Sequence, residues 1–182
     1  MYAKIILFAL IIVLAGCGRR VESYRPVIIA EILKNAAGEN IKPEIDSLVL
    51  VNTYTVAQVT DYWIAKERCG GNIDTLINHL QNIKMDNDHG QFNWLKWEKN
   101  RVRELKANDK KSVLYDVVKV NYTVEQLANK TKYSGKLYYI IHNSMVVGTT
   151  LEKDLKNTTN IGGNPIFAYE YIQFKFENPD LQ

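Results

Sequence analysis

The spacing of hydrophobic positions changes about two thirds of the way along this 182-residue chain. Before residue 107 apolar residues mostly recur every three or four positions, as on one face of a helix. From residue 112 they alternate with polar residues and are rich in β-branched and aromatic types, as in strands. Helices followed by strands predict an α+β fold, with N-terminal helices packed on one face of a C-terminal antiparallel sheet of about four strands.

Local signals place the first elements. The segment 27–37 follows Pro26, carries apolar residues on one side and stops at Gly38, so it is a predicted helix. The short β-branched run 47–51 is a predicted strand. Thr55-Val56-Ala57-Gln58 has the capping-box spacing and should open a second helix, ended by Gly70-Gly71.

Two more helices are expected before the change of period. Asn72 can cap the first of them. Its apolar positions keep a 3.6-residue period: Ile73, Leu76, Ile77, Leu80 and Ile83. The second covers about 91–107. It should bury Phe92, Leu95, Val102 and Leu105 and expose Lys96, Glu98 and Arg103.

Four strands are expected in the C-terminal part, at 112–124, 135–143, 145–150 and 166–176. Asn143-Ser144 should form a tight hairpin turn, and Gly162-Gly163-Asn164-Pro165 a turn before the last strand. In order and proportions, residues 53–176 resemble the nuclear-transport-factor-2-like and cystatin-like folds. This likeness is one of topology and implies no site residues.

The N-terminus has the composition of an export signal. Lys4 precedes an uncharged apolar stretch, 5–16, and Arg19 and Arg20 follow it. A helix that crosses a bilayer needs about 20 apolar residues, so the stretch is too short for a permanent transmembrane anchor. A cleaved signal is therefore expected.

Leu14-Ala15-Gly16-Cys17 resembles the lipobox of bacterial lipoprotein precursors at every position. The resemblance implies that a diacylglycerol is attached to the Cys17 sulfur and that a signal peptidase removes residues 1–16. We then expect a tether at 17–26 and a single globular domain at 27–182. Gly18 is not the aspartate that retains such proteins in the inner membrane of enterobacteria, so the resemblance favours the outer membrane, facing the periplasm.

Charge and cysteine content narrow the partners. Lys and Arg number 23 against 20 Asp and Glu, and the two signs are interspersed, so a nucleic-acid partner is not expected. Once Cys17 carries lipid, Cys69 has no intrachain disulfide partner. We expect a partly buried, inert thiol, with a thiol–imidazole pair of Cys69 and His79 or His89 as the alternative.

Other candidate sites are weak. Asp86, Asp88 and His89 precede Gly90 but do not match the calcium-loop spacing, so we expect a polar loop. The three histidines, His79, His89 and His142, lack a zinc-motif spacing, and no phosphate-binding loop occurs, so neither metal nor cofactor is expected. Several carboxylates could act as acid or base, but spacing singles out no pair: Asp61, Glu67, Asp116 and Glu170.

Aromatic residues are concentrated in the C-terminal half: Trp94, Trp97, Tyr138, Tyr139, Tyr169 and Tyr171. They are interpreted mainly as core and strand residues, or else as a platform for a carbohydrate or peptide. Together these observations predict a non-enzymatic, membrane-anchored envelope lipoprotein with a binding surface for a protein or glycan partner. The alternatives are a small-ligand module with a pocket between helices and sheet, and then an enzyme that uses Cys69 or a carboxylate.

Overall fold

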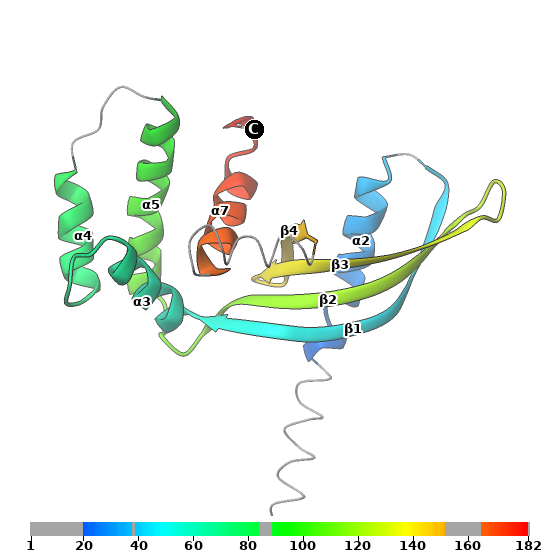
Figure 1. Cartoon of the computed structure of the whole chain (residues 1–182), viewed down its shortest axis with the longest axis horizontal. Coiled ribbons are helices and arrows are strands. Elements are labelled where there is room, and N and C mark those ends of the chain that lie inside the picture. The colour runs from blue at the N-terminus through cyan, green and yellow to red at the C-terminus, as the bar shows by residue number, and fades with distance from the viewer. Residues whose placement is uncertain (1–19, 38, 84–88, 152–164, 182) are drawn as a thin grey trace, which may run out of the picture. The chain divides into compact units, whose positions relative to one another are not determined.

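The computed structural model describes residues 20–37, 39–83, 89–151 and 165–181. These contain five α-helices and a four-stranded antiparallel sheet, which confirms the predicted α+β class (Figure 1). The described residues form two compact units. The first comprises 20–52 and 116–151, and the second 53–115 and 165–181.

The sheet has the strand order β1-β2-β3-β4. The strands are β1 (Ile41–Thr55), β2 (Val113–Gln126), β3 (Lys132–His142) and β4 (Met145–Thr150). The predicted strand at 47–51 is therefore correct but longer than expected. Because β1 precedes four of the five described helices, the sheet is not built from the C-terminal part of the chain alone.

The predicted hairpin between β3 and β4 is confirmed. Asn143 and Ser144 have φ values of 48° and 61°. Positive φ at both central residues is the geometry of a two-residue type I′ turn, whose twist matches that of the flanking strands. The turn sets the pairing of His142 with Met145.

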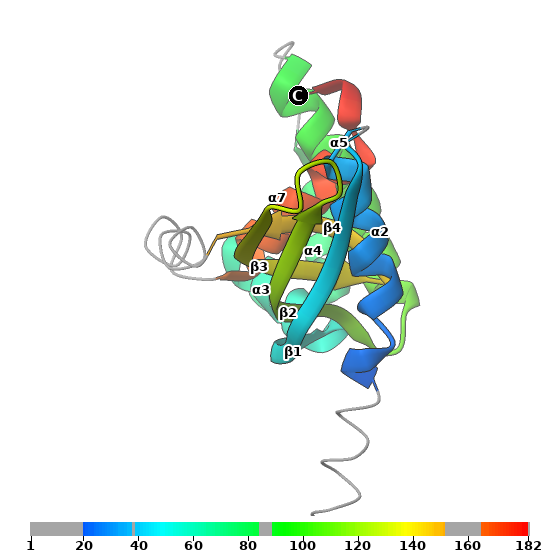
Figure 2. The same cartoon turned by 90° about the vertical axis from the view of Figure 1, so that its right-hand side faces the viewer.

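In the first unit, α2 (Arg25–Asn35) lies along one face of the sheet (Figure 2). Its bounds are two residues earlier than predicted. Ile28 and Ile32 pack against residues that point to the same sheet face, including Val118 on β2 and Tyr139 on β3, which are register partners. This alternation makes one face of the strands the core of the unit.

That core also takes in residues expected to belong to the tether. Val21 and Tyr24 are buried in it. Chain that is packed in this way cannot also serve as a free linker. Val21 and Tyr24 therefore belong to the folded unit, although the sequence placed them in a tether at 17–26.

The second unit holds the other helices: α3 (Val56–Lys66), α4 (Ile73–Asn82), α5 (His89–Ala107) and α7 (Pro165–Glu177). The capping residues predicted at the start of two of these helices are both confirmed. Thr55 and Gln58 form the capping box, and the side chain of Asn72 accepts from two amides of α4. The first of these helices ends at Lys66, earlier than expected, so Cys69 lies outside it.

The strand predicted at 166–176 is wrong, since this segment is helix α7. Pro165 is its first residue, a position where a missing amide hydrogen costs nothing. Its buried side chains follow the helical period: Ile166, Tyr169, Glu170, Gln173 and Phe174. In a short, nearly continuous apolar run, aromatic content favours a strand while the periodicity is ambiguous, and burial decided for the helix.

Candidate functional site

A buried ion pair joins helices α5 and α7 of the second unit. Glu170 on α7 is 0% exposed and Arg101 on α5 is 2% exposed. The Glu170 carboxylate accepts from Arg101 Nε and Nη2, both at 3.1 Å. It also accepts from Trp63 Nε1 at 2.9 Å and from the Tyr115 hydroxyl at 2.5 Å. Every member is thus hydrogen-bonded, which is the condition under which buried charges are tolerated.

The charges of this network are fixed by their surroundings. Burial opposes the Arg101 cation, but the combined effects of Glu170, Tyr115 and Glu104 outweigh it, so the pKa of Arg101 is raised. Burial and the nearby Glu170 carboxylate both raise the pKa of Tyr115 well above its ordinary value. Tyr115 therefore remains a neutral donor at physiological pH. With all its groups paired, the network is structural in character.

A second polar cluster lies nearer the surface, on α3 and α5. Lys66 Nζ is 2.7 Å from Glu67 Oε1 and 3.0 Å from Glu98 Oε1. The ammonium also lies 4.4 Å from the centre of the Trp63 ring. Glu98 was expected to be exposed, which is wrong: it is 3% exposed, because it pairs with Lys66 instead of pointing to solvent.

The Glu98 carboxyl group is poised to titrate near neutrality. Burial raises its pKa to about 7, against the opposing effect of Lys66, and the neighbouring Glu67 adds to the rise. Two carboxylates that share a site cannot both ionise easily, so one of them keeps its proton to a higher pH. The cluster can exchange a proton at physiological pH.

Cys69 borders this cluster, and its setting suits an inert thiol. Burial and the negative charge of Glu67 raise its pKa. Its sulfur donates to the Glu67 carbonyl at 3.5 Å. His79 Nε2 lies 3.9 Å from Glu67 Oε2. A thiolate nucleophile needs the opposite, a lowered pKa beside a base.

Three aromatic side chains from α5 and α7 form a partly exposed patch, which we call the aromatic surface: Trp94, Phe167 and Tyr171. Phe167 and Tyr171 are stacked, with ring planes 17° apart. The ring of Trp94 lies 6.2 Å from Phe167 and 6.1 Å from Tyr171. Tyr171 is 44% exposed, and Trp94 and Phe167 are half-buried. Lys175 Nζ lies 5.7 Å from the Tyr171 ring and Lys66 Nζ 5.9 Å from the Trp94 ring, which adds charge at the rim.

The structure sorts the aromatic residues that the sequence singled out. Trp94 and Tyr171 are brought together at the surface. Trp97 and Tyr169 are in the same unit but buried, and Trp97 donates to Glu177 at 2.6 Å. The other two candidates, Tyr138 and Tyr139, are buried residues of β3 in the first unit. The interpretation as core residues therefore holds for four of the six. Phe167 was not among the aromatic residues that the sequence analysis singled out.

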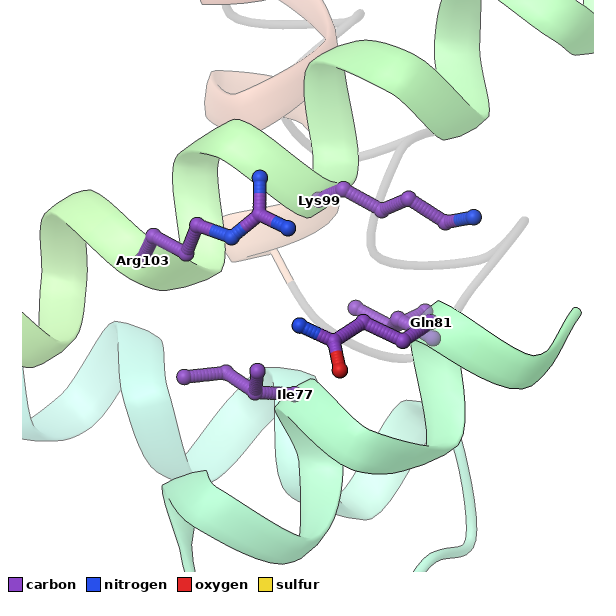
Figure 3. Close-up of a pocket in the computed structure, with 5 residues that line it drawn as sticks. Ile77, Gln81, Lys99 and Arg103 are labelled. Atoms are coloured by element: carbon purple, nitrogen blue, oxygen red, sulfur yellow. The ribbon is translucent and has the colours of Figure 1, made fainter.

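A hollow between α4 and α5 is shown in Figure 3. It is lined by Ile77, Leu80, Gln81, Lys99 and Arg103 and measures about 150 Å³. Binding pockets for small molecules usually measure about 300–1,000 Å³. This hollow is therefore too small for such a ligand.

The remaining candidate metal ligands from the sequence are not brought together in the described residues. Asp86 and Asp88 lie outside the described residues, and so does the side chain of His89. His142 is buried in the first unit and contacts the Asn143 amide at 3.1 Å. Within the part of the chain that the structure describes, no three histidine, cysteine or carboxylate side chains are grouped so that they could hold a metal ion. No described helix is long and apolar enough to cross a membrane.

The start of the first unit is fixed by a buried carboxylate. Asp116 on β2 is 1% exposed, and its Oδ2 is 2.5 Å from both Arg20 Nη2 and the Tyr24 hydroxyl. Arg20 Nε in turn donates to the Tyr24 hydroxyl at 3.2 Å. We call these three residues the N-terminal clamp. It ties the first described residue of the chain directly to the sheet.

Comparison of the chain with protein-family models, with curated proteins and with solved structures finds no match.

Proposed function

We propose that this chain is a lipid-anchored protein of the bacterial cell envelope that binds a glycan through its aromatic surface. The anchor is Cys17, with residues 1–16 removed, and the membrane is the outer membrane, with the domain facing the periplasm. The observation that carries the proposal is the position of Leu14-Ala15-Gly16-Cys17, three residues before the N-terminal clamp. A cleavage before Cys17 would leave every described residue of the fold intact.

The aromatic surface supports the partner. Flat rings provide contact area with little loss of conformational entropy. Fully exposed rings of this kind offer about 150–250 Å² each, so three partly exposed ones offer a few hundred Å². A stable protein interface needs about 800 Å² on each partner. The patch therefore suits a sugar chain better than a folded protein.

Catalysis has less support. The Arg101–Glu170 pair is buried and hydrogen-bonded throughout, which leaves it no free group for a substrate. The raised pKa of Cys69 opposes its use as a nucleophile. The cluster around Glu98 can exchange a proton, but acid–base exchange alone names no reaction. We therefore place binding before catalysis.

The anchor is tested by metabolic labelling with radioactive palmitate in a bacterial host. Cys17→Ala should give an unprocessed, unlabelled precursor. The chain offers a matched control in its only other cysteine: Cys69→Ala should be labelled and processed like the unmodified protein. Labelling of the Cys17 variant at the normal level would refute the anchor.

The partner is tested with the lipid-free chain and a panel of neutral, acidic and N-acetylated oligosaccharides. Binding is followed by the shift of tryptophan emission, to which half-buried Trp94 contributes. Tyr171→Ala should weaken binding at least tenfold. Tyr133→Ala is the control, because Tyr133 is 59% exposed but belongs to the first unit. Equal weakening in both variants, or binding to an envelope protein and to no glycan, would overturn the glycan proposal.

A further inference from the structure

The N-terminal clamp limits how far the folded chain can be from the site of lipid attachment. Three peptide units separate Cys17 from Arg20. An extended chain spans at most about 3.6 Å per residue, so their Cα atoms are at most about 11 Å apart. Arg20 cannot swing away to lengthen this distance, because its guanidinium is held by Asp116.

The residues that follow Arg20 are fixed as well. Val21 is buried against α2 and the sheet, and Tyr24 is both buried and hydrogen-bonded to Asp116. To free more chain, the unit would have to break this pairing and leave Asp116 buried without its partners, which is costly. The segment between Cys17 and Arg20, which we call the leash, is thus the whole linker that the fold permits.

The thickness of the headgroup layer, compared with this maximum distance, shows where Arg20 must lie relative to the membrane. The headgroup layer is about 5–8 Å thick on each side, the difference between the full bilayer and its hydrocarbon core. A lipidated cysteine has its sulfur at the level of the glycerol groups. A leash of about 11 Å that starts at this level then leaves Arg20 at most about 3–6 Å beyond the outer edge of the headgroups. We infer that the start of α2 is a membrane-docking surface, on which the first unit rests against lipid headgroups.

The charges around this surface suit zwitterionic as well as anionic lipids. Of the described cations beside the leash, Arg20 pairs with Asp116 and Arg25 with Glu22 at 2.9 Å. The leash itself carries Arg19, but the limit on its length is covalent and does not depend on that charge. A docking that depended on basic residues would need unpaired Lys or Arg and would weaken with salt. Docking by the leash should be independent of both salt and anionic lipid.

The inference rests on the proposed anchor, and the experiment separates the two. The lipoprotein is purified from a bacterial host in a Cys69→Ser background, with Ser23→Cys labelled by a fluorophore, and is reconstituted into phosphatidylcholine vesicles that carry a headgroup quencher. Mass spectrometry first establishes whether Cys17 carries lipid. Ser23 is exposed and lies between the clamp residues Arg20 and Tyr24.

We expect quenching of more than half of the emission at position 23, unchanged by salt or by added phosphatidylglycerol. The control variant has twenty Gly and Ser residues inserted between Gly18 and Arg19, which adds a mean reach of about 25 Å. Its quenching should fall to the level of a lipid-free sample. Equally weak quenching in both lipidated proteins would refute the docking and leave the anchor standing, whereas absence of lipid on Cys17 would refute both.

Discussion

Replacement of Glu170 by Gln tests whether the second unit depends on its buried ion pair. The substitution keeps the shape of the side chain and one of its two oxygens, so only one of the donors Trp63 and Tyr115, which bind different oxygens of Glu170, keeps its acceptor. It removes the charge that compensates Arg101, which is 2% exposed. A buried charge that loses its partner typically costs about 3–5 kcal/mol. Glu104 still contacts Arg101 Nη1 at 2.8 Å, so we expect a loss near the lower end, about 3 kcal/mol.

The assay is urea unfolding of the lipid-free chain, followed by tryptophan emission. All three tryptophans, Trp63, Trp94 and Trp97, belong to the second unit, so their emission reports on that unit. With a dependence of about 1–3 kcal/mol per molar urea, the midpoint should fall by roughly 1–3 M.

Two further variants make the test decisive. Glu104→Gln removes a carboxylate that also pairs with Arg101 but is 46% exposed, and it should cost less than about 1 kcal/mol. Arg101→Met combined with Glu170→Gln leaves no unpaired charge. It should therefore be more stable than Glu170→Gln alone. Equal costs for the Glu104 and Glu170 variants, or additive costs in the double variant, would refute the argument.

Three other outcomes are expected. Because the folded pKa of Glu98 is raised to about 7, the folded second unit holds a proton that the unfolded chain has released. The contribution of Glu98 to the stability of this unit should therefore be fully present below about pH 4 and decline by about 2 kcal/mol as the pH rises from 5 to 8; Glu98→Gln should remove the decline. Cys69 should react with iodoacetamide at pH 7.5 more slowly than free cysteine, since its pKa is raised. Gly135→Ala should destabilise the first unit by about 1–3 kcal/mol in thermal unfolding, because the new Cβ would lie 2.5 Å from Tyr122 Cζ.

Each of these has its own control. Asp61→Asn, an exposed carboxylate on α3, should leave the decline with pH unchanged. Unfolding in urea should restore the normal reactivity of the Cys69 thiol, so slow alkylation in urea would contradict the argument from burial. Removal of the opposing ring in a Tyr122→Ala background should abolish the penalty at Gly135, since the two residues are register partners.

Much of the local structure could be predicted because its causes lie within a few residues. Thr55 and Gln58 cap a helix three positions apart, and Asn143-Ser144 turns a hairpin by its own backbone preferences. The apolar period gave the approximate bounds of α2. The lipobox is also a local pattern, so the sequence alone suggests the anchor at Cys17.

Tertiary structure decided where the ambiguity concerned burial or distant partners. The segment now in α7 reads as a strand by composition, and only its packing selects the helix. The sequence pattern predicts an exposed Glu98, and only the tertiary structure places Lys66 beside it. Glu170 and Arg101 are 69 positions apart, and Tyr24 and Asp116 are 92 apart, so no spacing could indicate that they pair. A cap or a turn is stabilised by its sequence neighbours, whereas a buried charge is stabilised by whatever the fold places against it.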